Sequence, residues 1–96
     1  NKNTILRSRL FTHKEVIYSL TKNDPLSTLI GIYSAKESVK KALNISNLNL
    51  YSKIEINYEE NGRPFVLINN KKIINIDISI SHSNGYAISI CIPNSL

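Results

Sequence analysis

The sequence predicts one α+β domain in which an antiparallel β-sheet packs against a long α-helix. Its 96 residues are enough for a single domain and its core. The first half carries helix caps and helical spacing of apolar residues, whereas the second half alternates with a period of two. Neither a repeat nor a linker interrupts the chain, so we expect residues 1–96 to form one unit.

A short helix is predicted first. Thr12 can serve as its N-cap, and Glu15 follows three residues later, which is the spacing of a capping box. The apolar residues Val16, Ile17 and Leu20 continue the helical pattern. We therefore expect a helix of about two turns that ends near Leu20.

A second, longer helix follows. Asp24 is a favourable N-cap, and Pro25 suits the first helical position because proline has no N–H to leave unpaired. The pattern continues to about Leu43, and Asn44 can serve as the C-cap. This helix is the long element expected against the sheet.

The second half predicts a hairpin and then two longer strands. Isoleucine and tyrosine alternate with polar residues over residues 54–58, Asn61-Gly62 favours a hairpin through a type I′ turn, and residues 65–68 return. Residues 69–72 form a polar turn before the clearest alternation, and residues 82–85 turn the chain again. The alternating strand contains Ile74, Ile76, Ile78 and Ile80.

The last strand has one large and one small face. Its large residues are Tyr86, Ile88, Ile90 and Ile92, and its small ones are Ala87, Ser89 and Cys91. We expect the large face to lie in the core, and the small face to permit close packing by a helix or another subunit.

Charge and composition restrict the partners. A formal charge of +5 favours an anionic partner, such as a phosphorylated molecule, an acidic protein or a nucleic acid. The apolar runs are too short for a membrane span. Nucleic-acid binding needs aromatic residues exposed on the sheet, and Tyr86 is expected in the core. We therefore expect neither a membrane nor a nucleic acid as partner. Cys91, the single cysteine, fits a cytoplasmic protein.

Glu37 is the most informative residue of the long helix. On a helical projection it falls within the apolar stripe of Leu26, Leu29, Ile30 and Tyr33, where burial of a carboxylate is costly. One interpretation is a structural ion pair with Lys41, four residues later. The other is a metal-binding carboxylate beside a phosphate-binding lysine, an arrangement that phosphoryl transfer requires.

His82 ends the alternating strand. It can serve as a turn residue that hydrogen-bonds to backbone, or its imidazole can contact a phosphate or move a proton.

Together these segments resemble the 4′-phosphopantetheinyl transferases of the holo-[acyl-carrier-protein] synthase type. Residues 33–43 resemble the signature helix (F/W)-x-x-K-E-(A/S)-x-x-K-A, and residues 11–18 resemble the short F-T-x-x-E-x-x-Y helix. Residues 61–64 resemble the N-G-K-P hairpin, and residues 79–87 resemble the strand S-x-S-H-(T/S)-x-x-Y-A. The four motifs occur in the family's order and span most of the chain.

The resemblance implies transfer of 4′-phosphopantetheine from coenzyme A to a serine of an acyl carrier protein, with Mg²⁺. It implies Glu37 as metal ligand and catalytic residue, and Lys41 as a catalytic contact to the coenzyme A phosphates. It further implies a homotrimer with sites between protomers. The implied coenzyme A contacts are Lys41, Asn61, Gly62, Arg63, Pro64, His82 and Ser83; Arg7 and Arg9 are candidate contacts to the carrier protein.

Three residues are open to other interpretations. Lys36, which precedes Glu37, has a supporting electrostatic role or, like Lys40, is a solvated charge. Asp77 is interpreted as a residue of the polar face of its strand.

The sequence departs from the family pattern at two points. It lacks the family's N-terminal strand with G-x-D, whose aspartate is a second metal ligand, and Ile32 replaces the usual arginine five residues before the metal glutamate. The alternative function is therefore a catalytically degenerate domain that binds a carrier protein within a larger synthase.

Overall fold

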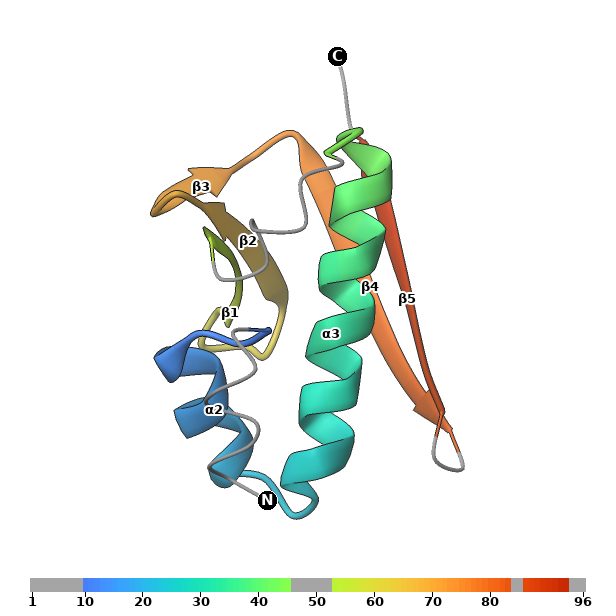
Figure 1. Ribbon diagram of the computed structural model, residues 1–96. Coiled ribbons are helices and arrows are strands. Elements are labelled where there is room, and N and C mark those ends of the chain that lie inside the picture. The colour runs from blue at the N-terminus through green and yellow to red at the C-terminus, as the bar shows by residue number, and fades with distance from the viewer. Residues whose placement is uncertain (1–9, 46–52, 84–85, 94–96) are drawn as a thin grey trace.

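The computed structural model describes residues 10–45, 53–83 and 86–93, and it confirms the α+β class (Figure 1). The chain forms α2 (His13–Leu20), α3 (Pro25–Ala42), β1 (Ile54–Tyr58), β2 (Pro64–Ile68), β3 (Lys71–Ile73), β4 (Ile76–Ser83) and β5 (Tyr86–Pro93). The strands divide into two antiparallel sheets, β1-β2-β3 and β4-β5, rather than one. The long helix α3 packs against α2, β1, β4 and β5.

Both helices begin at the predicted caps. The Glu15 amide donates to the Thr12 hydroxyl at 3.2 Å, and the Thr12 amide donates to the Glu15 carboxylate at 2.8 Å, which completes the capping box. Asp24 caps α3 by accepting from the Ser27 amide at 3.1 Å. The C-cap of α3 is Leu43 instead of Asn44, because Asn44 takes the left-handed conformation (φ 57°) at the position after the cap.

The predicted hairpin forms, but its turn is longer than the expected type I′ turn. The Glu59 amide donates to the Arg63 carbonyl at 2.9 Å, which leaves residues 60–62 as a three-residue loop. Gly62 has a φ of 87°, whereas Asn61 has no positive φ. This is the arrangement of a three-residue hairpin loop with glycine in the left-handed position.

The prediction for residues 69–74 is wrong in detail. Asn69 and Asn70 have positive φ values of 52° and 67°, so they complete a tight turn and allow the chain to return as β3. The next strand, β4, begins only at Ile76, and Ile74 is 82% exposed. Strand β4 also continues to Ser83, so His82 pairs with Ala87 within the strand and does not lie in a turn.

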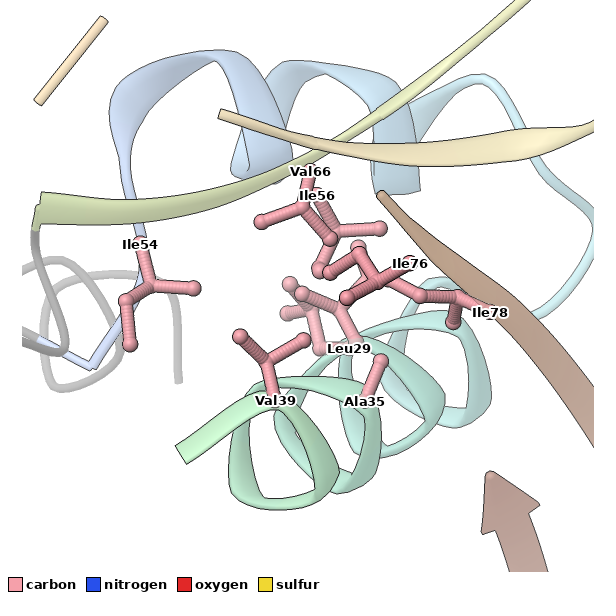
Figure 2. Close-up of a cluster of buried hydrophobic side chains, with 9 residues drawn as sticks. Leu29, Ala35, Val39, Ile54, Ile56, Val66, Ile76 and Ile78 are labelled. Carbon is pink, nitrogen blue, oxygen red and sulfur yellow. The ribbon is translucent and has the colours of Figure 1, made fainter. Parts of the chain in front are cut away.

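The core lies where α3 meets both sheets. Leu29, Ile32, Ala35 and Val39 of α3 are buried against residues of β1, β2 and β4 (Figure 2). The strand residues of this core are Ile54, Ile56, Val66, Ile76 and Ile78. In the described ranges, neither helix combines the length and apolarity that a membrane span requires.

The small face of β5 packs against a helix, as predicted, but the large face does not lie in the core of the chain. Ile88, Ile90 and Ile92 are more than half exposed, at 64%, 53% and 57%, whereas the small face lies on α3. The hydroxyl of Ser89 hydrogen-bonds with those of Ser34 at 2.9 Å and Ser38 at 2.7 Å. Small side chains let the helix approach β5 closely, so the large residues must face outward. The side chain of Tyr86 lies outside the described part.

Candidate active site

An open pocket of about 500 Å³ brings together four of the residues predicted to contact coenzyme A. Gly62, Arg63 and Pro64 line it from the hairpin, and His82 lines it from β4. Asn61 is not among the lining residues; its side-chain oxygen accepts from the Arg63 amide at 3.0 Å and so shapes the loop. The remaining lining residues are Tyr18, Lys22, Thr28, Tyr58, Ile78, Ser79 and Ile80.

Cations and aromatic rings give this pocket its chemistry. The ammonium of Lys22 lies 4.8 Å from the centre of the Tyr18 ring, and Tyr18 stacks on Tyr58 with centroids 4.0 Å apart. Arg63 also carries positive charge at the pocket, and Asp77 holds its guanidinium at 3.4 Å in an exposed ion pair. Exposed cations at the rim of a pocket can bind the phosphates of a nucleotide.

Sequence reasoning did not single out Lys22 or Tyr58 as site residues. Tyr18 belongs to the motif of residues 11–18, and its ring stacks on that of Tyr58. Burial raises the pKa of the Tyr58 hydroxyl, and nearby Tyr18 and Glu15 raise it further. The Tyr58 phenol is therefore neutral at physiological pH and can act as a hydrogen-bond donor.

The imidazole of His82 lies against the N-terminal half of α3. Its Nδ1 atom is 3.4 Å from the hydroxyl of Ser27, one turn into the helix. Since Thr28 of the same turn lines the pocket, α3 forms part of the wall beside His82.

Glu37 and Lys41 lie elsewhere on α3. Neither residue lines the pocket. Gly31, beside His82, and Glu37 are about 9 Å apart along the helix axis and about 120° apart around it. The predicted site residues of one chain therefore form two separate groups, one at the pocket and one on a different face of α3.

The stripe around Glu37 is more open than the sequence indicated. Leu26, Ile30 and Tyr33 are exposed, at 61%, 42% and 38%, whereas Leu29 is buried, so in the single chain the expected burial of this stripe holds only at Leu29. Glu37 is half-buried and Lys41 is exposed. Partial desolvation raises the pKa of the Tyr33 hydroxyl, and Glu37, which accepts a hydrogen bond from this hydroxyl, raises it further.

Glu37 has the donor chemistry of a magnesium ligand. Mg²⁺ prefers oxygen ligands and is often held by one or two carboxylates, with waters and substrate phosphates completing its coordination. Within residues 10–45, 53–83 and 86–93, no group of three or more histidine, cysteine, aspartate or glutamate side chains could hold a metal ion. The carboxylate of Glu37 is an oxygen ligand of the kind that such a site uses.

Lys36 is a structural residue of the interior, and neither it nor Lys40 is a solvated charge. The Lys36 ammonium lies 2.6 Å from the Glu15 carboxylate and donates to the Leu10 carbonyl at 2.8 Å. Lys36 is completely buried, and Lys40 is 9% exposed. Burial raises the pKa of Glu15 and lowers that of Lys36, while the charge of each partner acts in the opposite direction.

Three predicted contacts cannot be placed. Arg7 and Arg9 lie outside the described residues, as does the side chain of Ser83, although Ser83 itself is the last residue of β4.

Comparison with known proteins gives a consistent family. Residues 1–91 match the family model of the 4′-phosphopantetheinyl transferase superfamily. A holo-[acyl-carrier-protein] synthase of Caldicellulosiruptor saccharolyticus is 39% identical over 92 residues, which cover 88% of this chain and 75% of that protein. One from Thermoanaerobacter sp. (strain X514) is 39% identical over 100 residues, covering 94% of this chain and 72% of that protein.

A solved structure has the same fold. The crystal structure of Helicobacter pylori holo-[acyl-carrier-protein] synthase in complex with coenzyme A superposes with a TM-score of 0.74 at 24% identity. The similarity covers 94% of this chain and 82% of that one. The family match, the sequence identities and the four ordered motifs agree. The chain therefore belongs to the 4′-phosphopantetheinyl transferase superfamily, in its holo-[acyl-carrier-protein] synthase branch.

Proposed function

We propose that the chain transfers 4′-phosphopantetheine from coenzyme A to a serine of an acyl carrier protein and releases 3′,5′-ADP. The observation that carries this proposal is the pocket in which Gly62, Arg63, Pro64 and His82 meet. Gly62, Arg63 and Pro64 come from the hairpin motif and His82 from the strand motif, about 20 positions later. The resemblance implies coenzyme A contacts for both motifs, and the fold brings them to one pocket. The names of the relatives support the same reaction.

The pocket would hold the nucleotide end of coenzyme A. Arg63 and Lys22 supply positive charge for phosphates, and His82 supplies a ring nitrogen that can donate a hydrogen bond. Pro64 and the backbone of Gly62 offer a compact, rigid edge beside which a flat base can lie. In this arrangement Asn61 acts indirectly, by fixing the loop through the Arg63 amide.

The transfer itself is a displacement at phosphorus. The carrier serine oxygen forms a bond to the phosphorus that carries pantetheine, and the bond from that phosphorus to the bridging oxygen breaks. The bridging oxygen leaves with 3′,5′-ADP, and the serine proton passes to water or to a carboxylate. Lys41 would bind the phosphate oxygens and stabilise the negative charge that develops on the leaving group.

Glu37 would be the protein's ligand for Mg²⁺. The ion, when bound, neutralises phosphate charge and orients the diphosphate. Tyr33, four residues before Glu37 on the helix, donates a hydrogen bond to the Glu37 carboxylate. This bond would orient the carboxylate for the ion before the ion binds.

We also propose that the active unit is a homotrimer whose sites lie between protomers. Two observations support this: Glu37 and Lys41 are separate from the pocket of their own chain, and β5 exposes Ile88, Ile90 and Ile92 in a row. An exposed apolar row of this kind is typical of a surface that another subunit covers. One chain would then supply Glu37 while its neighbour supplies His82 and the hairpin.

The remaining partner is an acidic carrier protein in the cytoplasm. The charge of +5 would attract both such a protein and the polyanionic coenzyme A. We assign the docking contact to Arg7 and Arg9.

The deciding experiment incubates the purified chain with coenzyme A, Mg²⁺ and an apo-carrier protein. We expect the mass of the carrier protein to increase by one phosphopantetheine and an equal amount of 3′,5′-ADP to appear. Binding of the carrier protein without release of 3′,5′-ADP would instead support the degenerate binding domain.

A further inference from the structure

Gly31 occupies an unfavourable place for glycine. It is buried in the interior of α3, as the seventh residue of an 18-residue helix. Apart from proline, glycine is the residue that least favours a helix interior, because it loses the most backbone freedom there. Gly31 is not among the described residues with positive φ, so the backbone conformation does not require glycine.

The close approach of His82 explains the glycine. A Cβ atom built on Gly31 would collide with Cε1 of the His82 imidazole and would lie 2.7 Å from its Nε2. The same atom would lie 3.2 Å from the Cγ2 atom of Ile80, which is tight but can be relieved by a small shift. The ring of His82 therefore occupies the space that any other side chain at position 31 would fill.

Ser27 is the second residue of α3 that contacts the His82 imidazole. It lies four residues before Gly31 and so on the same face of the helix. Its hydroxyl is 3.4 Å from Nδ1 of His82, while Nε2 lies toward Gly31. Ser27 and Gly31 therefore face the same edge of the imidazole, the one formed by Nδ1, Cε1 and Nε2, and this edge lies against α3.

We propose that Gly31 is a positioning residue for coenzyme A binding: its missing side chain lets the imidazole of His82 approach α3 closely, where it forms part of the wall of the nucleotide pocket. The inference rests on the proposed function for its ligand, but its structural part concerns His82 alone. The atoms that would collide are the far end of a side chain and not backbone. Substitution of Gly31 should therefore displace the ring and leave the fold in place.

Gly31→Ala should weaken coenzyme A binding without lowering the melting temperature. Alanine favours the helix more than glycine does, so the melting temperature should stay constant or rise. Coenzyme A binding should weaken about tenfold, which corresponds to the loss of one charge-assisted hydrogen bond. A residue that served packing alone would lower the melting temperature when replaced.

The test compares wild type, Gly31→Ala, His82→Ala and the double variant. Calorimetry gives the Kd for coenzyme A, and thermal melting gives the stability. The nitrogen chemical shifts of the imidazole report on the His82 ring, with His13 of α2 as an internal reference. We expect the shifts of His82 alone to change in Gly31→Ala, and the double variant to bind coenzyme A as weakly as His82→Ala does.

Each outcome decides one claim. A wild-type chain that does not bind coenzyme A overturns the proposed function. If the wild type binds it and Gly31→Ala binds it equally well, only the present inference fails. Unchanged His82 shifts, or loss of the cooperative melt in Gly31→Ala, also contradict the inference, because the ring is then not what moves.

Discussion

The Lys36 ammonium and the Glu15 carboxylate are 2.6 Å apart, and both side chains are completely buried. The second carboxylate oxygen of Glu15 accepts from the Ile56 amide at 2.7 Å, so the pair joins α2, α3 and β1. Glu37, the next residue, points about 100° away around the helix and is half-buried. The adjacent lysine and glutamate of the signature helix thus have different surroundings: Lys36 joins three elements in the interior, whereas Glu37 lies outside the core, where we propose that it binds the metal.

Replacement of Lys36 should therefore damage stability. Lys36→Met removes one partner of a buried pair and leaves the Glu15 carboxylate without its cation, which should cost about 3–5 kcal/mol of unfolding free energy. Lys14→Met is the matched control, because Lys14 is exposed on α2, and it should change stability by less than about 0.5 kcal/mol. Urea unfolding measures both. Equal stability of the two variants would contradict the structural role of Lys36.

Glu37→Gln should instead lower activity and leave stability almost unchanged. It keeps the size of the side chain but removes the charge that we assign to the metal, so the transfer rate should fall roughly 10²-fold or more. The melting temperature should change little, because Glu37 is not in the core. Glu60→Gln, at an exposed position of the hairpin loop, serves as the control. Full turnover of Glu37→Gln at saturating Mg²⁺ would remove Glu37 from the catalytic site.

Lys41→Ala tests the contact to phosphate. We expect weaker coenzyme A binding or slower transfer, and the same loss with an acyl-coenzyme A, because the thiol lies at the other end of the substrate. The loss should decrease at high ionic strength, where the wild-type charge is screened as well. Lys53→Ala, at another exposed lysine, controls for the change in net charge. Identical kinetics of the Lys41→Ala and Lys53→Ala variants would show that Lys41 makes no specific contact.

Local features of the fold were predictable from the sequence because their causes are local. The caps Thr12 and Asp24 satisfy helix amides within three residues, and both helices begin where the caps place them. The hairpin at Gly62 likewise follows from the freedom of glycine to adopt positive φ.

Which face of an element is buried was harder to predict, because it depends on distant packing. A period of two in β5 defines two faces, but it does not say that α3 takes the small one through Ser89. The helical stripe around Glu37 similarly suggested a buried carboxylate, whereas the completely buried one is Glu15. The capping box explained only part of what Glu15 does, and its bonds to Lys36 and Ile56 join segments far apart in the sequence.

The candidate site has the same division. The motifs identified Gly62, Arg63, Pro64 and His82, and the fold brings these residues together. Lys22 and Tyr58 belong to no quoted motif, and their place at the pocket follows only from how α2 and β1 pack.

The exposed row on β5 leads to a prediction about assembly. Ile90→Asp places a charge in the middle of this row, so it should convert trimers into monomers, since burial of an unpaired carboxylate is costly. Ile17→Asp is a close match, because Ile17 on α2 is 50% exposed and Ile90 is 53% exposed. Light scattering at micromolar concentration gives the masses. A monomeric wild type, or a trimeric Ile90→Asp variant, would contradict the assignment of this surface.

If the sites lie between protomers, two inactive variants should restore activity when they form mixed trimers. Glu37→Gln lacks the metal ligand but keeps its pocket, whereas His82→Ala has a defective pocket but keeps Glu37 and Lys41. A site at the junction of the two variants can then combine the intact Glu37 of one chain with the intact His82 of the other. Random mixing in a closed ring makes about a quarter of the sites complete.

The two variants are unfolded together, refolded and assayed for 3′,5′-ADP release, with each variant refolded alone as the control. Recovery of roughly a quarter of wild-type turnover supports shared sites. Turnover no higher than the average of the separate variants, in mixtures that mass spectrometry shows to contain both chains, would mean that each chain builds its site alone.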